Sequence, residues 1–384
     1  MGYGDIFTIE EIRQKKKEYF EAFDNISFVE YIRKEKVERM KKIPTPLFPM
    51  DDFFYNPQNV SPYDMDFELQ FMSNSTQMTQ YQEMLEMTNS NLAEKSYPGR
   101  SLKILLVEKN TKQVAGFIRI GSPTLNMGPR NKVLRFSDND ENHKISSVIN
   151  NHIFNGQIIV PSQPFGFNYA AGKLLALMCC SHEIREKLDS MYDTETMMFE
   201  TTSLYGSIKN QSMYDGLKPF MRGHGQTESN FIPNIPSRFF KPIRSWFEEK
   251  LGEPLVDPEA SSRRMKQQRK IESIILSVLR EKGTESEVIE WNNNIQYLKD
   301  NMNNKKNYYY SFYGYGNASD YIMGRVDTPK KSPNFDKFYM DNLIEWWRNK
   351  ANNRYQKLLN EGRFREKLEI WTDSDIQKNV DIVR

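Results

Sequence analysis

Residues Gly156–Met178 read GQIIVPSQPFGFNYAAGKLLALM and contain the pattern that decides the fold. The apolar run Gly156–Val160 predicts a short buried strand. A loop with Gly166 follows, and Ala170–Met178 predicts a strongly apolar helix. Backbone N–H groups at a helix N-terminus bind anions, and small residues let a phosphate approach them. The run therefore predicts a strand–loop–helix unit with an anion-binding turn, and an ordinary turn packed by small residues is the alternative.

The segments around this unit predict more strands and helices. Leu102–Glu108 and Gln113–Ile120 are apolar runs separated by a short polar turn, which predicts a β-hairpin. Thr196–Tyr205 predicts a further strand, and Gly121–Asn142 is polar enough for a long loop or a flap. We also expect a last strand at Phe231–Ser237 and a break at Asn307–Asn317. The expected helices are Thr8–Lys42, Asp64–Glu94, Ile145–Phe154, Asn210–Phe220, Ile243–Leu251, Arg263–Glu281, Ser286–Asn301 and Phe335–Trp371.

This order predicts an α+β fold with an α/β-like mixed sheet flanked by helices, and with helical extensions at both ends. We expect three consecutive regions. Residues 1–62 form a helical arm with a proline- and aromatic-rich connector, residues 63–240 contain the sheet, and residues 241–384 are mostly helical.

Composition narrows the classes of protein. The chain has 384 residues, 53 Lys and Arg against 51 Asp and Glu, and a net charge of +2, which excludes a histone-like polycation. The adjacent Cys179 and Cys180 exclude a disulfide scaffold and a cysteine-rich zinc module. The four histidines lack metal-ligand spacing, so we expect no metal. Without a long apolar run or a signal peptide, we expect a cytoplasmic protein with no membrane span. Its oligomeric state is left open.

The order of hairpin, strand–loop–helix, strand and helix resembles the GNAT acyltransferase superfamily. LKILLVEKNTKQVAGFIRI resembles the second and third strands of that family, and IIVPSQPFGFNYAAGKLLALM its fourth strand, acyl-CoA pyrophosphate loop and next helix. MMFETTSLYGSIKNQSMYDGLKP resembles its fifth strand and fourth helix. Within the superfamily, residues 102–234 are most similar to the branch that contains the phage Mom-type DNA-modification proteins and the Druantia DruA protein.

This resemblance implies an acyl group transferred from acetyl-CoA or another acyl-CoA to an amine. The family loop reads Gln/Arg-x-x-Gly-x-Gly/Ala, which Gln163 and Gly166 match, whereas Asn168 departs from it. The backbone amides of Val160 and Ser162 are the candidates to polarise the thioester carbonyl, because unused strand N–H groups stabilise a developing oxyanion. The implied cofactor-binding residues are Val160, Ser162, Gln163, Gly166, Asn168, Ala170, Gly172 and Asn210.

The resemblance also implies catalytic residues. Tyr214 is the candidate general acid for the leaving thiolate, with a core aromatic as the alternative. Glu200 is a carboxylate among apolar strand residues, where it is costly unless used or paired. It is therefore the candidate base, with a structural hydrogen-bonding role as the alternative. Ser203, with Thr202, is a candidate to orient the substrate, and the loop residue His224 is another candidate base.

Mom-type proteins modify an exocyclic amine of adenine in DNA, so the resemblance makes DNA an expected partner in a phage or anti-phage setting. A base that leaves the duplex needs a basic groove and aromatic faces. The candidate contacts are Arg263, Arg264, Lys266, Arg269, Lys305, Lys306, Tyr309 and Tyr313, and the alternative is a solvated helix face with a packed aromatic turn.

Three other functions remain open on the sequence alone. One is a DNA-binding protein that keeps the fold without catalysis, and another is an N-acetyltransferase for proteins or small molecules. A structural or virion protein is the weakest option.

Overall fold

The structure is a computed structural model, and it describes residues 2–23, 27–40, 50–88, 99–136, 142–203, 211–227, 234–260, 263–302 and 305–371. The chain folds into two units. Unit 1 consists of Met1–Lys36 and Ser229–Asn304, and unit 2 of Val37–Glu228 and Lys305–Arg384. The structure thus divides the chain differently from the three consecutive regions expected from the sequence, because unit 1 is built from two segments distant in sequence.

Unit 1 is a helical bundle. Its helices are α1 (Tyr3–Ile6), α2 (Ile9–Glu21), the first part of α3 (Phe28–Met40), α12 (Ser237–Leu251), α13 (Arg263–Lys282) and α14 (Glu285–Asn301). Helix α2 begins with a capping box between Thr8 and Glu11, as the sequence pattern suggests. Its buried Tyr19 packs against Trp291 of α14, with ring centroids 5.4 Å apart. Apolar residues of α13 complete this core.

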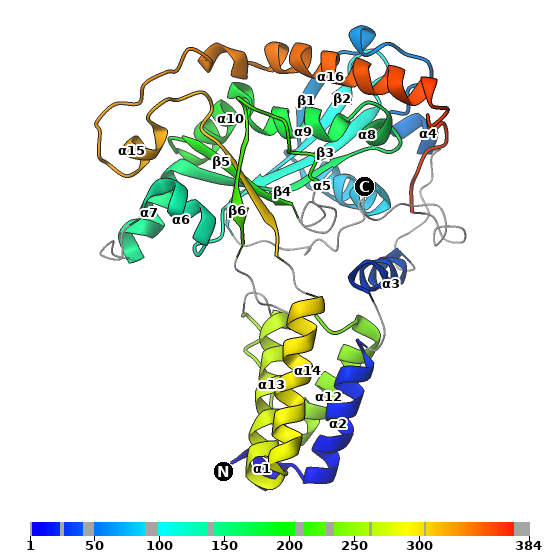
Figure 1. The fold of residues 1–384 in the computed structure, drawn as a ribbon, viewed down its shortest axis with the longest axis vertical. Helices are drawn as coiled ribbons and strands as arrows, with labels where there is room; N and C mark the ends of the chain where they lie inside the picture. Colours follow the sequence, from blue (N-terminus) through cyan, green and yellow to red (C-terminus); the bar gives the residue numbers. More distant parts are fainter. Residues whose placement is uncertain are drawn as a thin grey trace. The chain divides into compact units, whose positions relative to one another are not determined.

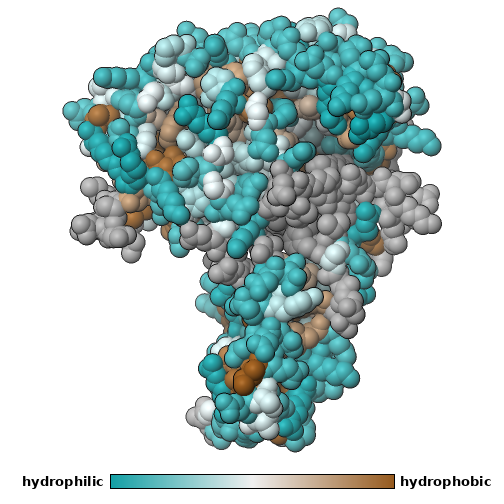
Figure 2. All heavy atoms as spheres, viewed as in Figure 1, coloured by the Kyte–Doolittle hydropathy of each residue, from teal (hydrophilic) through white to brown (hydrophobic). Residues whose placement is uncertain are grey.

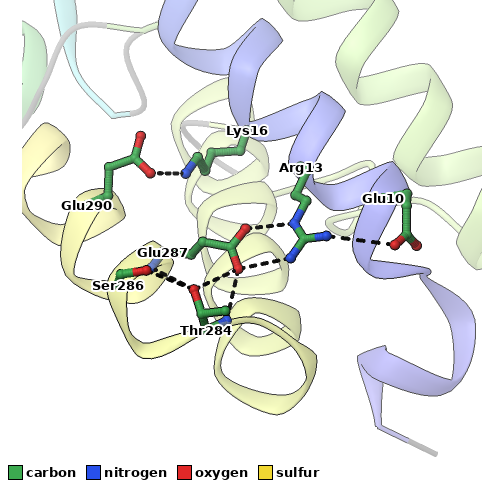
Figure 3. Close-up of polar contacts among 7 residues, drawn as sticks. All are labelled: Glu10, Arg13, Lys16, Thr284, Ser286, Glu287 and Glu290. Carbon is green, nitrogen blue, oxygen red and sulfur yellow. Dashed lines mark hydrogen bonds and ion pairs between the residues drawn. The ribbon is translucent and has the colours of Figure 1, made fainter.

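Polar contacts also join α2 to α14 (Figure 3). The Nε atom of Arg13 lies 2.7 Å from Oε1 of Glu287, and Nζ of Lys16 lies 2.6 Å from Oε2 of Glu290. Glu287 also forms a capping box with Thr284, so one carboxylate both starts α14 and binds α2.

Unit 2 is built around a seven-stranded sheet of order β1-β2-β3-β4-β5-β7-β6. Its strands are β1 (Phe67–Phe71), β2 (Ser101–Glu108), β3 (Val114–Gly121), β4 (Ile153–Pro161), β5 (Met198–Ser203), β6 (Arg222–Gln226) and β7 (Asn307–Ser311). Every neighbouring pair is antiparallel except β4 and β5, which are parallel. The expected α+β fold with a mixed sheet flanked by helices is confirmed.

Helices cover both faces of this sheet (Figure 1). One face packs against α9 (Ala171–Cys179), α10 (His182–Tyr192) and α16 (Met340–Asn360), and we call it the α9 face. The other packs against α5 (Ser75–Thr88), α6 (Gly128–Leu134), α7 (Asn142–His152) and α15 (Ala318–Ile322), and we call it the α6 face. The remaining short helices are α4 (Met50–Phe53), η1 (Pro62–Asp64), α8 (Phe165–Asn168) and η2 (Phe335–Phe338).

The hairpin and the strand–loop–helix unit are confirmed, but several other expectations are wrong. Phe67–Phe71 is the edge strand β1 rather than helix, because its alternating side chains fit pairing with β2. Residues 121–142 contain the helix α6 rather than only a loop. Residues 211–220 form turns, not a helix. The last strand of the sheet in sequence order is β7, inside the expected break at 307–317.

The expected strand at residues 231–237 was also misplaced. Residues 231–233 lie outside the described residues, and Ser237 begins α12. The strand β6 occurs earlier, at Arg222–Gln226, where it pairs with β7. The segment Ser229–Asn304 of unit 1 therefore lies between two paired strands of unit 2 in sequence.

The visible surface is largely hydrophilic. Figure 2 shows hydrophobic residues only in small separate patches on this face. The large hydrophobic side chains most exposed among the described residues are Tyr297, Leu125 and Ile289. Such scattered residues do not by themselves mark a binding surface.

Candidate functional site

The central feature of unit 2 is the point at which β4 and β5 part. The two strands pair from Ile153 with Met198 to Gly156 with Thr201. Beyond that pair β4 runs on to Pro161 and β5 to Ser203 without pairing to each other. The hydroxyl of Thr201 donates to the carbonyl of Gly156 at 2.9 Å, across the last pair. The pairing of the two strands therefore ends at Gly156 and Thr201, and we call the place beyond this pair the β4–β5 gap.

The two expected catalytic residues flank this gap on opposite faces of the sheet. Glu200 and Thr201 are neighbours on β5, so their side chains point to opposite faces. Glu200 lies on the α6 face, where it contacts Tyr308. Thr201 lies on the α9 face, where Tyr214 hydrogen-bonds to it. Two groups on opposite faces cannot meet directly, but each can act on a different reactant that reaches the gap from its own side.

Glu200 is held by a closed polar network. Its Oε1 accepts a hydrogen bond from Nη1 of Arg130 at 3.2 Å, and its Oε2 accepts one from the hydroxyl of Tyr308 at 2.8 Å. Asn155, its partner on β4, also hydrogen-bonds to it. Burial raises the pKa of Glu200, while Arg130, Tyr308 and Asn155 oppose this rise. With both oxygens engaged, the carboxylate reaches a substrate only after one of these partners has moved.

Arg130 comes from the segment that the sequence suggested as a flap. Pro129 stands at the start of α6, where proline is favoured, and Arg130 follows it as a buried residue. Besides Glu200, its guanidinium binds the carbonyls of Thr124 and Leu125 at 2.8 and 2.5 Å. Residues 124–130 are therefore tied to Glu200 through one arginine.

Tyr214 lies in a turn on the α9 face. It is buried, and its ring packs edge-on against Tyr309 with centroids 5.1 Å apart. Burial raises its pKa well above that of free tyrosine, so the hydroxyl keeps its proton at neutral pH. Ser203 is half-buried at the end of β5 opposite Asn307, on the same face. His224 is exposed on β6, and Asn210 lies outside the described residues.

The amides expected to hold the thioester carbonyl are engaged in the sheet. The N–H of Ser162 donates to the carbonyl of Ala115 on β3 at 2.9 Å. Amides alternate in direction along a strand, so the N–H of Val160, opposite Phe117, faces β3 as well. The role expected for Val160 and Ser162 is therefore wrong. By the same alternation, the backbone of Ile159 faces the β4–β5 gap.

The loop after β4 uses most of its own polar groups. The N–H of Gly166 donates to Ser162, that of Phe167 to the side chain of Gln163, and that of Asn168 to Pro164. These amides are therefore not directed at a ligand, contrary to the expectation. Asn168 instead binds the backbone of Arg365, donating to its carbonyl at 2.7 Å and accepting from its N–H at 3.1 Å.

The start of α9 is the remaining candidate for anion binding in this loop, and the N–H of Lys173 there already donates to the carbonyl of Ala170 at 2.9 Å. Ala170 precedes the helix with φ 53°, and Gly172 lies in its first turn. The first amides of a helix have no intrahelical acceptor and favour anions. A Cβ on Gly172 would lie 2.7 Å from Sδ of Met213, so glycine is needed there for packing. Lys173 follows and donates to the carbonyls of Met213 and Asp215.

The expected nucleic-acid contacts fall into two groups. Arg263, Lys266 and Arg269 are exposed on α13 of unit 1, whereas Arg264 binds Ser237 and the carbonyl of Ile235. In unit 2, Lys305 is exposed and Lys306 is half-buried before β7. Tyr309 and Tyr313 are only 4% and 0% exposed, so neither ring has a free face for a base. Stacking by these two residues is ruled out by their packing on the α9 face.

Sequence reasoning missed Arg130, Asn155 and Tyr308, the partners of Glu200. Pro129 was the local signal for a helix start before Arg130, but no pattern links residues 70 and 108 positions apart.

Within the described ranges, no three His, Cys, Asp or Glu side chains gather as a metal site. None of the described helices is both long and apolar enough to span a bilayer.

Comparisons with known proteins point to one family. No curated protein and no solved structure matches the chain. The family model described as Druantia protein DruA matches residues 16–215, which include β1 to β5, Glu200 and Tyr214. Because this match spans more than half of the chain, the protein belongs to the Druantia DruA family.

Proposed function

We propose that unit 2 is an N-acyltransferase domain that modifies an exocyclic amine of a DNA base in an anti-phage setting. The observation that carries the proposal is the β4–β5 gap, with Tyr214 on one face and Glu200 on the other. Where the pairing of two parallel strands ends, an extended arm would bind between them, and the two faces of the sheet would keep donor and acceptor apart. The DruA family assignment is consistent with an anti-phage setting.

The residues present fit an acyl-CoA only in part. The amides of Gly166, Phe167 and Asn168 are engaged, so the start of α9 and nearby cations would hold its pyrophosphate. The cofactor supplies the activated acyl group as a thioester. The α9 face of the gap, next to Tyr214, is the side on which its thioester end would lie.

The roles of the chain's own residues follow from their faces. A C–N bond forms to the amine while the C–S bond breaks. Glu200, on the α6 face, would accept the proton lost by the amine, and Tyr214, on the α9 face, would donate its proton to the leaving thiolate. Arg130 and Tyr308 hydrogen-bond to the two carboxylate oxygens of Glu200. Residues 124–130 must therefore move before an acceptor reaches this carboxylate. An aromatic amine is a weak nucleophile, so a raised carboxylate pKa is an advantage here.

The test is mass spectrometry of nucleosides from DNA co-expressed with the full chain. We expect an acylated nucleoside with the wild-type protein, none with Tyr214→Phe, and an unchanged yield with the exposed control Tyr63→Phe. Thermal unfolding checks that both variants fold. A folded protein that binds neither acetyl-CoA nor related thioesters in calorimetry would overturn the proposal.

A second candidate is a DNA-binding protein without catalysis. The closed network at Glu200 and the engaged loop amides favour it. Residues 263–270 of α13 also contain five cations and no carboxylate, although cations oppose the helix dipole at that end. Its signature is salt-dependent DNA binding that survives both Glu200→Ala and Tyr214→Phe with no modified nucleoside. Detection of such a nucleoside excludes this candidate.

A further inference from the structure

Gln157 is the first residue of β4 beyond its last pair with β5. That pairing ends at Gly156 and Thr201, so Gln157 has no partner on β5. It has no partner on β3 either, because the β3 register passes from Ile158 directly to Gly156. Gln157 is therefore the extra residue of a β-bulge. Such bulges redirect a side chain away from the regular ladder.

The side chain of Gln157 lies on the α6 face of the sheet. Its Nε2 would lie 2.7 Å from a Cβ placed on Gly121, and it donates to the carbonyl of Ser122 at 3.4 Å. Gly121 pairs with Asn155, and directly opposite residues of an antiparallel pair point to the same face. Asn155 in turn hydrogen-bonds to Glu200. Gln157 and the candidate base thus share one face of the sheet.

The carboxamide of Gln157 has one unsatisfied atom. Its Oε1 is buried, and no described residue donates a hydrogen bond to it. The carbonyl of Ser122 fixes which amide atom is left over, because only the NH₂ end can donate to a carbonyl. Since the hydrogen bond to Ser122 is long, the side chain can turn its oxygen toward a ligand.

Arg130 has an unsatisfied donor on the same face. Its side chain is fully buried and binds Glu200 through Nη1, but no described residue accepts a hydrogen bond from its Nε. Buried polar groups are nearly always hydrogen-bonded in folded proteins. An unsatisfied acceptor and an unsatisfied donor on the face of Glu200 therefore indicate a ligand with a complementary donor and acceptor.

We propose that Gln157 binds the exocyclic amino group of the acceptor base. The amino group donates one hydrogen to Oε1 of Gln157, and its other hydrogen is left for Glu200. Nε of Arg130 donates to the ring nitrogen beside the amino group. Adenine, cytosine and guanine each have an amino group next to a ring nitrogen with a free lone pair, whereas thymine has no amino group. This inference rests on the proposed function for the acceptor being a DNA base.

The test compares short oligothymidylates whose central thymine is replaced by adenine, cytosine or guanine. In calorimetry with the full chain, the wild type should bind at least one of these strands about tenfold more tightly than the all-thymine strand. Gln157→Met keeps the length of the side chain but removes its amide, and it should abolish this preference. A wild-type chain without any preference, or a preference that survives in Gln157→Met, overturns the proposal.

The ratio of affinities separates recognition from a structural effect. A purely structural role of Gln157 would weaken binding of all strands together and leave their ratio unchanged, which also overturns the proposal. The matched control is Gln70→Met on the edge strand β1 of the same sheet, where the amide of Gln70 binds the exposed Glu68. This variant should keep the wild-type preference.

A second measurement needs no variant, in case Gln157→Met does not fold. The preferred base is replaced by its analogue without the amino group, which is purine for adenine, pyrimidin-2-one for cytosine and hypoxanthine for guanine. The wild-type chain should then lose its preference for that strand over the all-thymine strand. Equal binding of the base and its analogue contradicts the proposal.

The outcomes also separate this inference from the proposed function. A preference for an amino-bearing base that needs Gln157, with no modified nucleoside in the DNA assay, supports the binding role and rejects the reaction. Modified nucleosides at the wild-type yield from Gln157→Met keep the reaction and reject the role of Gln157.

Discussion

Nη1 of Arg130 lies 3.2 Å from Oε1 of Glu200, and neither side chain is exposed to solvent. A deeply buried ion pair often adds nothing to the free energy of unfolding, or lowers it, compared with apolar side chains of the same volume. Removing only one partner lowers the free energy of unfolding much more, because it leaves a buried charge without its counter-ion. Its position on the α6 face, one residue before β4 and β5 part, links the stability of the sheet to the candidate base. The pair therefore ties residues 124–130 to β5 through the side chain of Arg130.

Removing one partner of this pair should destabilise unit 2 strongly. Arg130→Met leaves the carboxylate of Glu200 buried without its cation, and we expect a loss of roughly 3–5 kcal/mol in the free energy of unfolding. The double variant Arg130→Met/Glu200→Gln should recover much of this loss, because no buried charge then remains. Chemical denaturation measures both variants. A single variant as stable as the wild type would show that the pair is solvated in solution.

The contact between Arg13 and Glu287 should make unit 1 sensitive to acid. Its hydrogen bond from Arg13 is the main reason that the pKa of Glu287 falls from 4.5 to about 2. A carboxylate with a lowered folded-state pKa stabilises the fold above its unfolded pKa, and this stability is lost as the pH falls from 4.5 toward 2. The difference in melting temperature between wild type and Glu287→Gln should therefore shrink over that range.

Two further variants complete this test of unit 1. Arg13→Gln should show part of the effect of Glu287→Gln, because the capping box with Thr284 also lowers the pKa of Glu287 (Figure 3). Glu285→Gln, at the exposed first position of α14, should follow the wild type across the same pH range. A constant melting difference from pH 5 to pH 2 would contradict the role given to Glu287.

Gly116 should be intolerant of a side chain. A Cβ there would lie 2.5 Å from Cδ2 of Leu175 on α9 and 2.9 Å from the carbonyl of Val160. We expect Gly116→Ala to lower the free energy of unfolding by about 1–3 kcal/mol, because α9 must move away from the sheet to make room for the methyl group. The matched control is Gly316→Ala, whose added Cβ would meet nothing closer than 3.8 Å. Urea unfolding curves that coincide for the two variants would refute the close approach of α9.

Asn168 should hold the C-terminal segment in place. Asn168→Ala removes two hydrogen bonds to the backbone of Arg365. We expect the free energy of detaching the C-terminal segment from the loop after β4 to fall by about 1–3 kcal/mol. Trypsin should then cleave faster after Arg365 and Lys367. Asn56→Ala, which removes one exposed bond to Glu366, should accelerate cleavage less. The opposite ranking of the two variants would place the main anchor elsewhere.

Local patterns identified the middle of the sheet but not its edges. The runs Leu102–Glu108, Gln113–Ile120 and Gly156–Val160 are apolar enough to form strands in almost any context, and they do. Phe67–Phe71 is too short to separate strand from helix by its apolar residues alone, and pairing with β2 decides it. The strand β7 follows β5 by more than a hundred residues, with a segment of unit 1 between them, so no local signal announces their pairing.

The candidate site divides in the same way. Glu200 and Tyr214 could be selected from the sequence, since a carboxylate in an apolar strand and a tyrosine after it are local features. Their placement on opposite faces needs the register of β5. The strand register also decides on which face each tyrosine after Lys306 lies. Because side chains alternate along β7, Tyr308 contacts Glu200 and Tyr309 packs against Tyr214.

By itself the sequence determined the elements whose apolar periodicity is strong, the strand–loop–helix unit among them, because backbone conformation there follows from nearest neighbours along the chain. Only the tertiary structure decided which polar groups are used. Ser162 binds Ala115, Arg130 binds Glu200 and Asn168 binds Arg365, and each of these bonds joins residues far apart in sequence. A buried donor must find an acceptor somewhere, but the partner is chosen by the packing of whole elements rather than by the residues beside it.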